Sequence, residues 1–96
     1  MLHIIQQVDE YIRQCGGSHT QWYAGIASRP RDRLFVDHGV REKDDAWIFR
    51  DCASDAAARQ VEDHFLTRGC QGGPGGGDYS TKYFYAYKIR PHTLES

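Results

Sequence analysis

The chain lacks paired cysteines and any long apolar run. Its three cysteines, Cys15, Cys52 and Cys70, are odd in number and widely spaced, so the sequence predicts neither a disulfide framework nor a paired-cysteine zinc site. We therefore expect reduced thiols in a cytoplasmic protein. No segment approaches the roughly 20 apolar residues of a membrane span. Residues 1–5 lack a basic leader and an apolar stretch, so we expect neither a signal peptide nor a membrane partner.

The chain also lacks an excess of basic over acidic residues. Twelve lysines and arginines stand against thirteen aspartates and glutamates, interspersed along the chain, and the formal net charge is -1. Proteins that hold a long duplex through phosphate contacts usually carry a basic stripe. The balance therefore argues against strong, general affinity for nucleic acid, although it leaves room for a local basic patch around Arg29, Arg31 and Arg33.

The chain has enough apolar and aromatic material for one small core. Of its 96 residues, 40% are hydrophobic and 26% are charged, a balance typical of a soluble globular domain. No repeat or linker divides the sequence. We therefore expect residues 1–96 to form a single domain.

The first part of the chain predicts a helix followed by a strand. Apolar residues recur every three or four positions over 4–15, which favours an amphipathic helix that ends at Gly16 and Gly17. Tyr11 lies on that face and is expected in the core. The apolar run 21–27, with its two aromatic residues, predicts a strand.

A short second helix is predicted directly after this strand. Ser28 can cap it, Pro30 suits a first helical turn, and the helix would run over 31–38. Gly39 would close it. Arg33 is expected at the rim of the packed surface.

The second half of the chain predicts a strand, a helix and a last strand. Residues 46–52 read as a buried strand, and Ser54 or Asp55 can cap a helix that runs to about residue 68. Glu62 falls beside the apolar stripe of this helix, where a carboxylate can face a cleft without being buried. These elements indicate the α+β class.

The last strand is predicted over 83–89, after a glycine-rich segment at 69–78. Its alternation places Tyr83, Tyr85 and Tyr87 on one face, and the tail from about residue 91 is expected to be loose. The whole fold is then a small three-stranded sheet, mixed or antiparallel, packed with about three helices. The strand order is not determined by the sequence.

One group of residues suits phosphodiester cleavage. Such a reaction needs a group that activates water, a positive charge beside the phosphoryl oxygens and usually a metal ion held by a carboxylate. Tyr23 can act as a base or orient the water, Arg33 can stabilise the developing charge, and Glu62 can hold a divalent cation. Gly25, two residues after Tyr23, leaves room for another backbone or a ligand to approach.

The spacing of Tyr23, Gly25 and Arg33, followed by a strand and by a helix with Glu62, resembles the second half of the GIY-YIG nuclease motif. The resemblance covers roughly residues 21–66. It implies a metal-dependent endonuclease that cuts DNA with Mg²⁺ or Mn²⁺ at Glu62. Gly25, Arg29 and Arg31 are then expected to contact the substrate.

The first half of that motif is missing from its usual place. Members of the family open with a strand that carries its own glycine and tyrosine about ten residues earlier, whereas this chain has a helix and a polar turn there. The tyrosine-rich last strand can take the vacant position in the sheet and bring Tyr85 or a neighbour beside Tyr23. His38 lies one residue further from Arg33 than the family's usual histidine, and Asp78 can add a second carboxylate if its loop folds back.

Simpler interpretations stay open for each residue alone. Tyr23 can be a core aromatic, Arg33 a solvated charge and Glu62 a surface acid. The glycine-rich segment lacks the lysine of a phosphate-binding loop, so it reads as a linker or a loop over the substrate. The alternative function is a catalytically inactive module that binds another protein, or a second copy of itself, through its aromatic strand.

Overall fold

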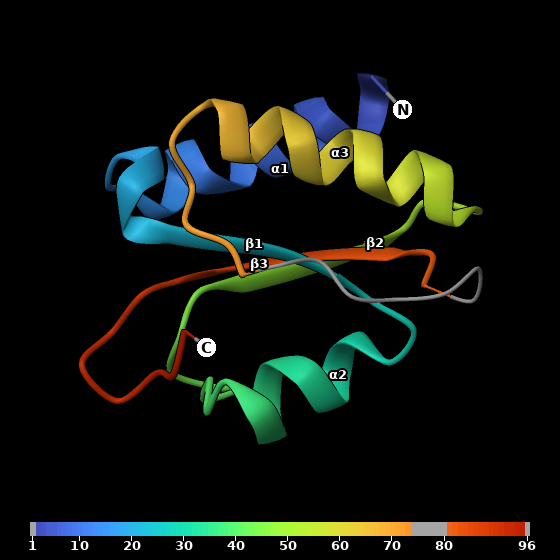
Figure 1. The fold of residues 1–96 in the computed structure, drawn as a ribbon. Helices are drawn as coiled ribbons and strands as arrows, with labels where there is room; N and C mark the ends of the chain where they lie inside the picture. The colour runs from blue at the N-terminus through green and yellow to red at the C-terminus, as the bar shows by residue number, and fades with distance from the viewer. Residues whose placement is uncertain (1, 74–80, 96) are drawn as a thin grey trace.

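A three-stranded antiparallel sheet lies between helices in the computed structural model, which describes residues 2–73 and 81–95 (Figure 1). The strands are β1 (Trp22–Ala27), β2 (Trp47–Asp51) and β3 (Tyr83–Lys88), in the order β1-β3-β2. The expected α+β class is confirmed. Both pairings among these three strands are antiparallel, so the mixed alternative is excluded for them.

Two helices cover one face of the sheet. They are α1 (Leu2–Cys15) and α3 (Asp55–Thr67), which lie side by side above the strands in Figure 1. Each turns its apolar stripe inward, as the three-and-four spacing predicts. The main core lies between them and the sheet and contains Ile4, Val8, Ile12, Trp22, Ala24, Ile26, Ala58, Val61, Phe65, Phe84 and Ala86.

The opposite face carries a second, aromatic core. A short α-helical segment, α2 (Pro30–Asp32), continues into a π-helical segment, η2 (Arg33–Asp37), and both lie under this face (Figure 1). Tyr85 and Tyr87 of the central strand are buried here with Tyr23 of β1 and Leu34 of η2. Two hydrophobic layers therefore share one sheet, because successive side chains of a strand point to opposite faces.

The short helix departs from its sequence prediction. It begins at Pro30 and not at Arg31, and it changes to π-helical winding at Arg33. Arg29 precedes it without any side-chain cap, so the expected cap at Ser28 is wrong. Gly39 does end it in the left-handed conformation, with φ of 71°.

The remaining boundaries agree closely with the sequence. The strand expected from residue 21 begins at Trp22, because His19–Gln21 forms a turn of 3-10 helix (η1). Ser54 caps α3, its side chain accepting a hydrogen bond from the backbone N–H of Ala57.

The carboxy-terminal tail is not loose up to residue 95. The backbone N–H of Leu94 donates to the carbonyl oxygen of His38 at 2.8 Å, and Thr93 is buried. The tail therefore closes over the aromatic core. Of the helices in the described ranges, none combines the length and apolar character needed to cross a bilayer.

Candidate active site

Tyr23 and Tyr85 lie beside each other on the aromatic face of the sheet. Tyr23 pairs with Tyr87 in the β1-β3 ladder and Gly25 pairs with Tyr85. The rings of Tyr23 and Tyr85 are stacked, with centroids 6.4 Å apart. The ring of Tyr87 lies closer still to Tyr23, with centroids 5.3 Å apart, so the tyrosine-rich strand brings both Tyr85 and Tyr87 beside Tyr23.

Gly25 makes room for Tyr85. A Cβ atom at Gly25 would lie 2.6 Å from both Cζ and the hydroxyl oxygen of Tyr85. The space above the glycine is therefore already filled by the Tyr85 ring. The room at Gly25 is thus used by the phenol of Tyr85, and contact between Gly25 and a substrate stays a prediction.

The π-helical winding brings Arg33 and His38 to the same side of their segment. In an α-helix, residues five apart are rotated by roughly 140° from alignment. Here the backbone N–H of His38 donates to the carbonyl oxygen of Arg33 at 2.9 Å, an i to i+5 bond. Both side chains consequently face Tyr85.

His38 is completely buried and its protonation can be assigned from its partners. Its Nδ1 lies 2.5 Å from the carbonyl oxygen of Leu94, which can only accept, so Nδ1 carries a hydrogen. Burial lowers the pKa of His38, with the nearby charge of Arg33 acting in the same direction, which favours the neutral ring. Nε2 is then an acceptor, and the hydroxyl of Tyr85 donates to it at 2.7 Å.

Arg33 approaches the same hydroxyl from the open side. A side-chain hydrogen bond to Tyr85 raises the pKa of Arg33. Burial raises the pKa of Tyr85 to about 12, although Arg33 opposes that change. The side chain of Arg33 remains 44% exposed and also pairs with Asp37 at 3.3 Å. Tyr85 is therefore a protonated phenol held between a guanidinium and a neutral imidazole.

Glu62 lies on α3, on the opposite side of the sheet from Tyr85. Its negative charge is the smallest of the named causes that shift the pKa of Tyr85. Only 6% of Glu62 is exposed, so the expectation of an unburied carboxylate is wrong. Burial is also the main cause that raises the pKa of Glu62, and the neighbouring Asp63 adds to it.

A single carboxylate is a suitable donor for a hard divalent cation. Mg²⁺ keeps several waters and is commonly held by one or two carboxylates together with substrate phosphates. Burial raises the pKa of Glu62 and so disfavours its ionised form, whereas a nearby positive charge would favour that form. Within residues 2–73 and 81–95, no three His, Cys, Asp or Glu side chains cluster as a metal-binding group.

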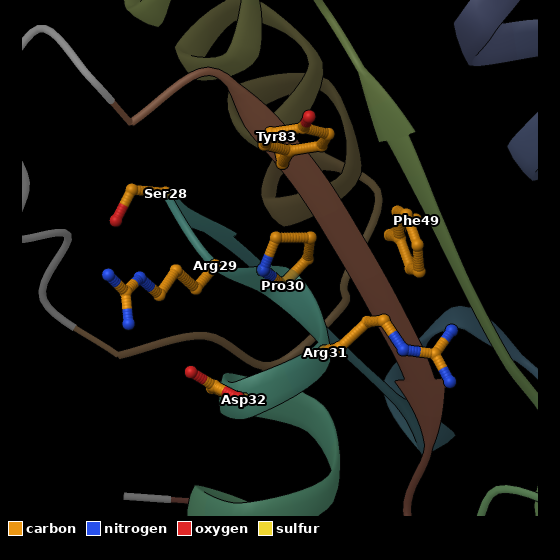
Figure 2. Close-up of a pocket in the computed structure, with 7 residues that line it drawn as sticks. All are labelled: Ser28, Arg29, Pro30, Arg31, Asp32, Phe49 and Tyr83. Carbon is orange, nitrogen blue, oxygen red and sulfur yellow. The ribbon is translucent and has the colours of Figure 1, made fainter.

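The other two expected substrate contacts are not among the residues around the Tyr85 hydroxyl and line a neighbouring hollow. Arg29 and Arg31 line a hollow of about 380 Å³ beside α2, where their side chains extend in opposite directions (Figure 2). Arg31 donates to Glu42 at 2.5 Å and lies over the Phe35 ring. Asp78 lies outside the described residues.

Several contacts of the site have no local sequence signal. The Tyr23 hydroxyl accepts a hydrogen bond from the backbone N–H of Gly73 at 3.0 Å. The Tyr87 hydroxyl donates to Glu95 at 2.8 Å. These partners are 50 and 8 residues away in the chain, and Leu94 acts through its backbone alone. Only the tyrosine alternation of β3 could have indicated Tyr87.

Comparisons with protein-family models, with curated proteins and with solved structures find no match for this chain.

Proposed function

We propose that the protein is a metal-dependent nuclease of the GIY-YIG type that hydrolyses phosphodiester bonds in DNA. The observation that carries the proposal is the meeting of Arg33 and His38 at the hydroxyl of Tyr85, with the charge of the buried Glu62 adding to the raised pKa of that phenol. Tyr23 stacks on the same phenol. Residues from four separate elements thus supply the positive charge, the proton acceptor and the carboxylate that the reaction needs.

The one-residue offset of His38 supports the relationship to this family. The family's usual histidine follows the arginine one residue earlier than His38 follows Arg33. A π-turn accommodates one extra residue in a helix. Since η2 is π-helical from Arg33 to Asp37, the longer spacing is absorbed and the imidazole still reaches the site.

The position of β3 supports it as well. The family's first half-motif supplies a strand with a tyrosine, and here the strand beside β1 is the last one in the chain. In the proposed relationship, Tyr85 on that strand serves as the missing tyrosine. The family's set of side chains would then be assembled from a different order along the sequence.

In the proposed reaction Arg33 binds the scissile phosphate, because it is the most exposed member of the group. Water attacks phosphorus and gives its proton to the Tyr85 oxygen, while the proton of Tyr85 moves to Nε2 of His38. The bond from phosphorus to the leaving oxygen breaks, and that oxygen takes a proton from solvent. His38 releases its added proton to solvent, which restores the neutral imidazole. The guanidinium stabilises the negative charge that develops on the phosphoryl oxygens.

Glu62 would hold Mg²⁺ or Mn²⁺ beside this centre. The charge of the bound ion offsets the negative charge of the phosphoryl oxygens. The buried carboxylate also has a separate effect on Tyr85, because its negative charge disfavours the phenolate.

The test is nicking of supercoiled plasmid DNA by the purified protein with Mg²⁺ or Mn²⁺. We expect Arg33→Ala and Glu62→Ala each to lower the rate by roughly 10²-fold or more, since each removes a charge that acts on the transition state. Arg13→Ala and Glu10→Ala are matched controls, because these two exposed residues pair with each other on α1. Full activity in both site variants would end the proposal.

A second function is favoured by the burial of the phenols. Tyr23, Tyr85 and His38 expose 3%, 1% and 0% of their surface, which also suits a domain that keeps this fold as a scaffold and binds another protein. Such a module would leave DNA intact with either metal ion. The same nicking assay therefore separates the two functions.

A further inference from the structure

The hollow beside α2 is walled by rings. Pro30 of α2, Phe49 of β2 and Tyr83 of β3 face one opening (Figure 2). Its volume of about 380 Å³ lies at the small end of the range for ligand pockets. Phe49 and Tyr83 are half-buried, so their ring faces remain accessible.

These rings belong to a longer aromatic row. The rings of Trp47 and Phe49 are nearly parallel, at 12° with centroids 6.0 Å apart, and Tyr83 meets Phe49 edge-on at 6.2 Å. Tyr83 lies diagonally across from Phe49 in the β2-β3 ladder. The ladder fixes the positions of Phe49 and Tyr83 on neighbouring strands.

Cations surround the rings. Arg29 is exposed and forms no ion pair with any residue that the structure describes. The Lys82 ammonium lies 5.8 Å from the centroid of the Tyr83 ring and 3.9 Å from the Asp51 carboxylate. A ligand that combines a flat ring with negative charge complements both features.

We propose that the hollow binds an unpaired nucleobase of a single-stranded nucleic acid, with Arg29 contacting its phosphate. Every base has a flat π-face, and stacking on aromatic side chains is the common means by which proteins hold single strands. The site also compensates for the lack of excess positive charge in the chain. With a formal net charge of -1, phosphate contacts alone would bind weakly, whereas stacking does not depend on net charge.

The hollow adjoins the catalytic group. That its ligand is part of the nuclease substrate rests on the proposed function. Tyr83 and Tyr85 are two residues apart on β3, about 7 Å along an antiparallel strand. Arg29 and Arg33 lie one helical turn apart. A base in the hollow would therefore place a neighbouring phosphate near Arg33, and the preferred substrate would contain a single-stranded segment.

Binding is tested separately from cleavage, in EDTA, by fluorescence anisotropy. The probes are a labelled single-stranded oligothymidine, the matching duplex, and an abasic oligonucleotide of equal length and charge. We expect the protein to bind the base-bearing single strand at least about tenfold more tightly than the abasic one. Equal affinity for these two would overturn the proposal.

Variants locate the interaction. Tyr83→Leu and Phe49→Leu should each weaken binding of the single strand roughly tenfold, while Tyr83→Phe, which keeps the ring, should bind as the parent does. Arg29→Ala should weaken binding of both single strands, and Arg13→Ala on α1 should weaken neither. Unchanged binding in both leucine variants, or preferential binding of a proline-rich peptide, would refute the assignment.

The two proposals fail in different ways. Base-dependent binding without any cleavage in Mg²⁺ or Mn²⁺ would remove the nuclease function and leave the hollow as a nucleic-acid site. Cleavage that is equally fast in the parent and in Tyr83→Leu, on a substrate with a single-stranded segment, would retain the nuclease function and reject the hollow.

Discussion

Replacing Gly25 by alanine tests whether the glycine exists to seat Tyr85. The added Cβ would lie 2.6 Å from Cζ and 2.9 Å from Cε2 of the Tyr85 ring, well inside van der Waals contact. The ring cannot rotate away freely, because it is 1% exposed and its hydroxyl is bonded to His38. Either the strands or the phenol must shift.

The expected loss of stability can be worked out from its parts. Overpacking a well-filled core costs about 1–3 kcal/mol, and losing the Tyr85–His38 hydrogen bond costs about 1 kcal/mol more. Replacing glycine in a strand returns roughly 0.5–1 kcal/mol of backbone entropy. The net loss is about 2 kcal/mol, which for a domain of this size lowers Tm by about 8–16 °C.

Thermal unfolding followed by circular dichroism measures the change, and a double-mutant cycle isolates its cause. In a Tyr85→Leu background the clashing ring atoms are gone, so Gly25→Ala should be neutral or slightly stabilising there. The reasoning is refuted if Gly25→Ala lowers Tm equally in both backgrounds, or if it leaves the Tm of the parent unchanged.

Three further changes follow from the local geometry and the pKa directions. Burial raises the pKa of Glu62 above its ordinary 4.5, so the folded protein loses stability as pH rises through that raised value. In EDTA, Glu62→Gln should therefore raise Tm at neutral pH and change it little below pH 4.5. An equal gain in Tm at both pH values would contradict this. Burial lowers the pKa of His38 below 6.5, so the stability present above pH 6.5 should decline as pH falls through the lowered pKa. Urea titrations should show a weaker decline in the free energy of unfolding for His38→Gln than for His3→Gln. The His3→Gln variant is the control, because it keeps the buried imidazole. Ala53 holds φ of 73°, so Ala53→Gly should raise the free energy of unfolding by about 0.5–1 kcal/mol, and a urea midpoint that does not rise would count against this strain.

The sequence predicted the elements whose signals are local. The periodic stripe and its glycine terminus located α1, and the Ser54 cap located the start of α3. The alternation of β3 correctly placed Tyr85 and Tyr87 on one face. Such features depend on neighbours within a turn or two of the chain, where backbone sterics and hydrogen bonding act directly.

Three other predictions were wrong or incomplete. Ser28 was predicted to cap the second helix, but that helix begins at Pro30 and its N-cap residue is Arg29. Glu62 was expected to be open, and it is buried. Gly25 was expected to face a ligand, and a ring from β3 fills its space. For Gly25 the deciding neighbour comes from a distant part of the chain, so no local pattern could identify it.

By itself, the sequence determined a small α+β domain with two amphipathic helices and a set of reactive side chains in a given order. Only the tertiary structure decided that β3 enters the middle of the sheet, that π-helical winding turns Arg33 and His38 the same way, and that the tail seals His38 through Leu94. The physical reason is that residue propensities act over a few bonds, whereas strand order and burial are set by how the whole chain satisfies its apolar and polar groups at once.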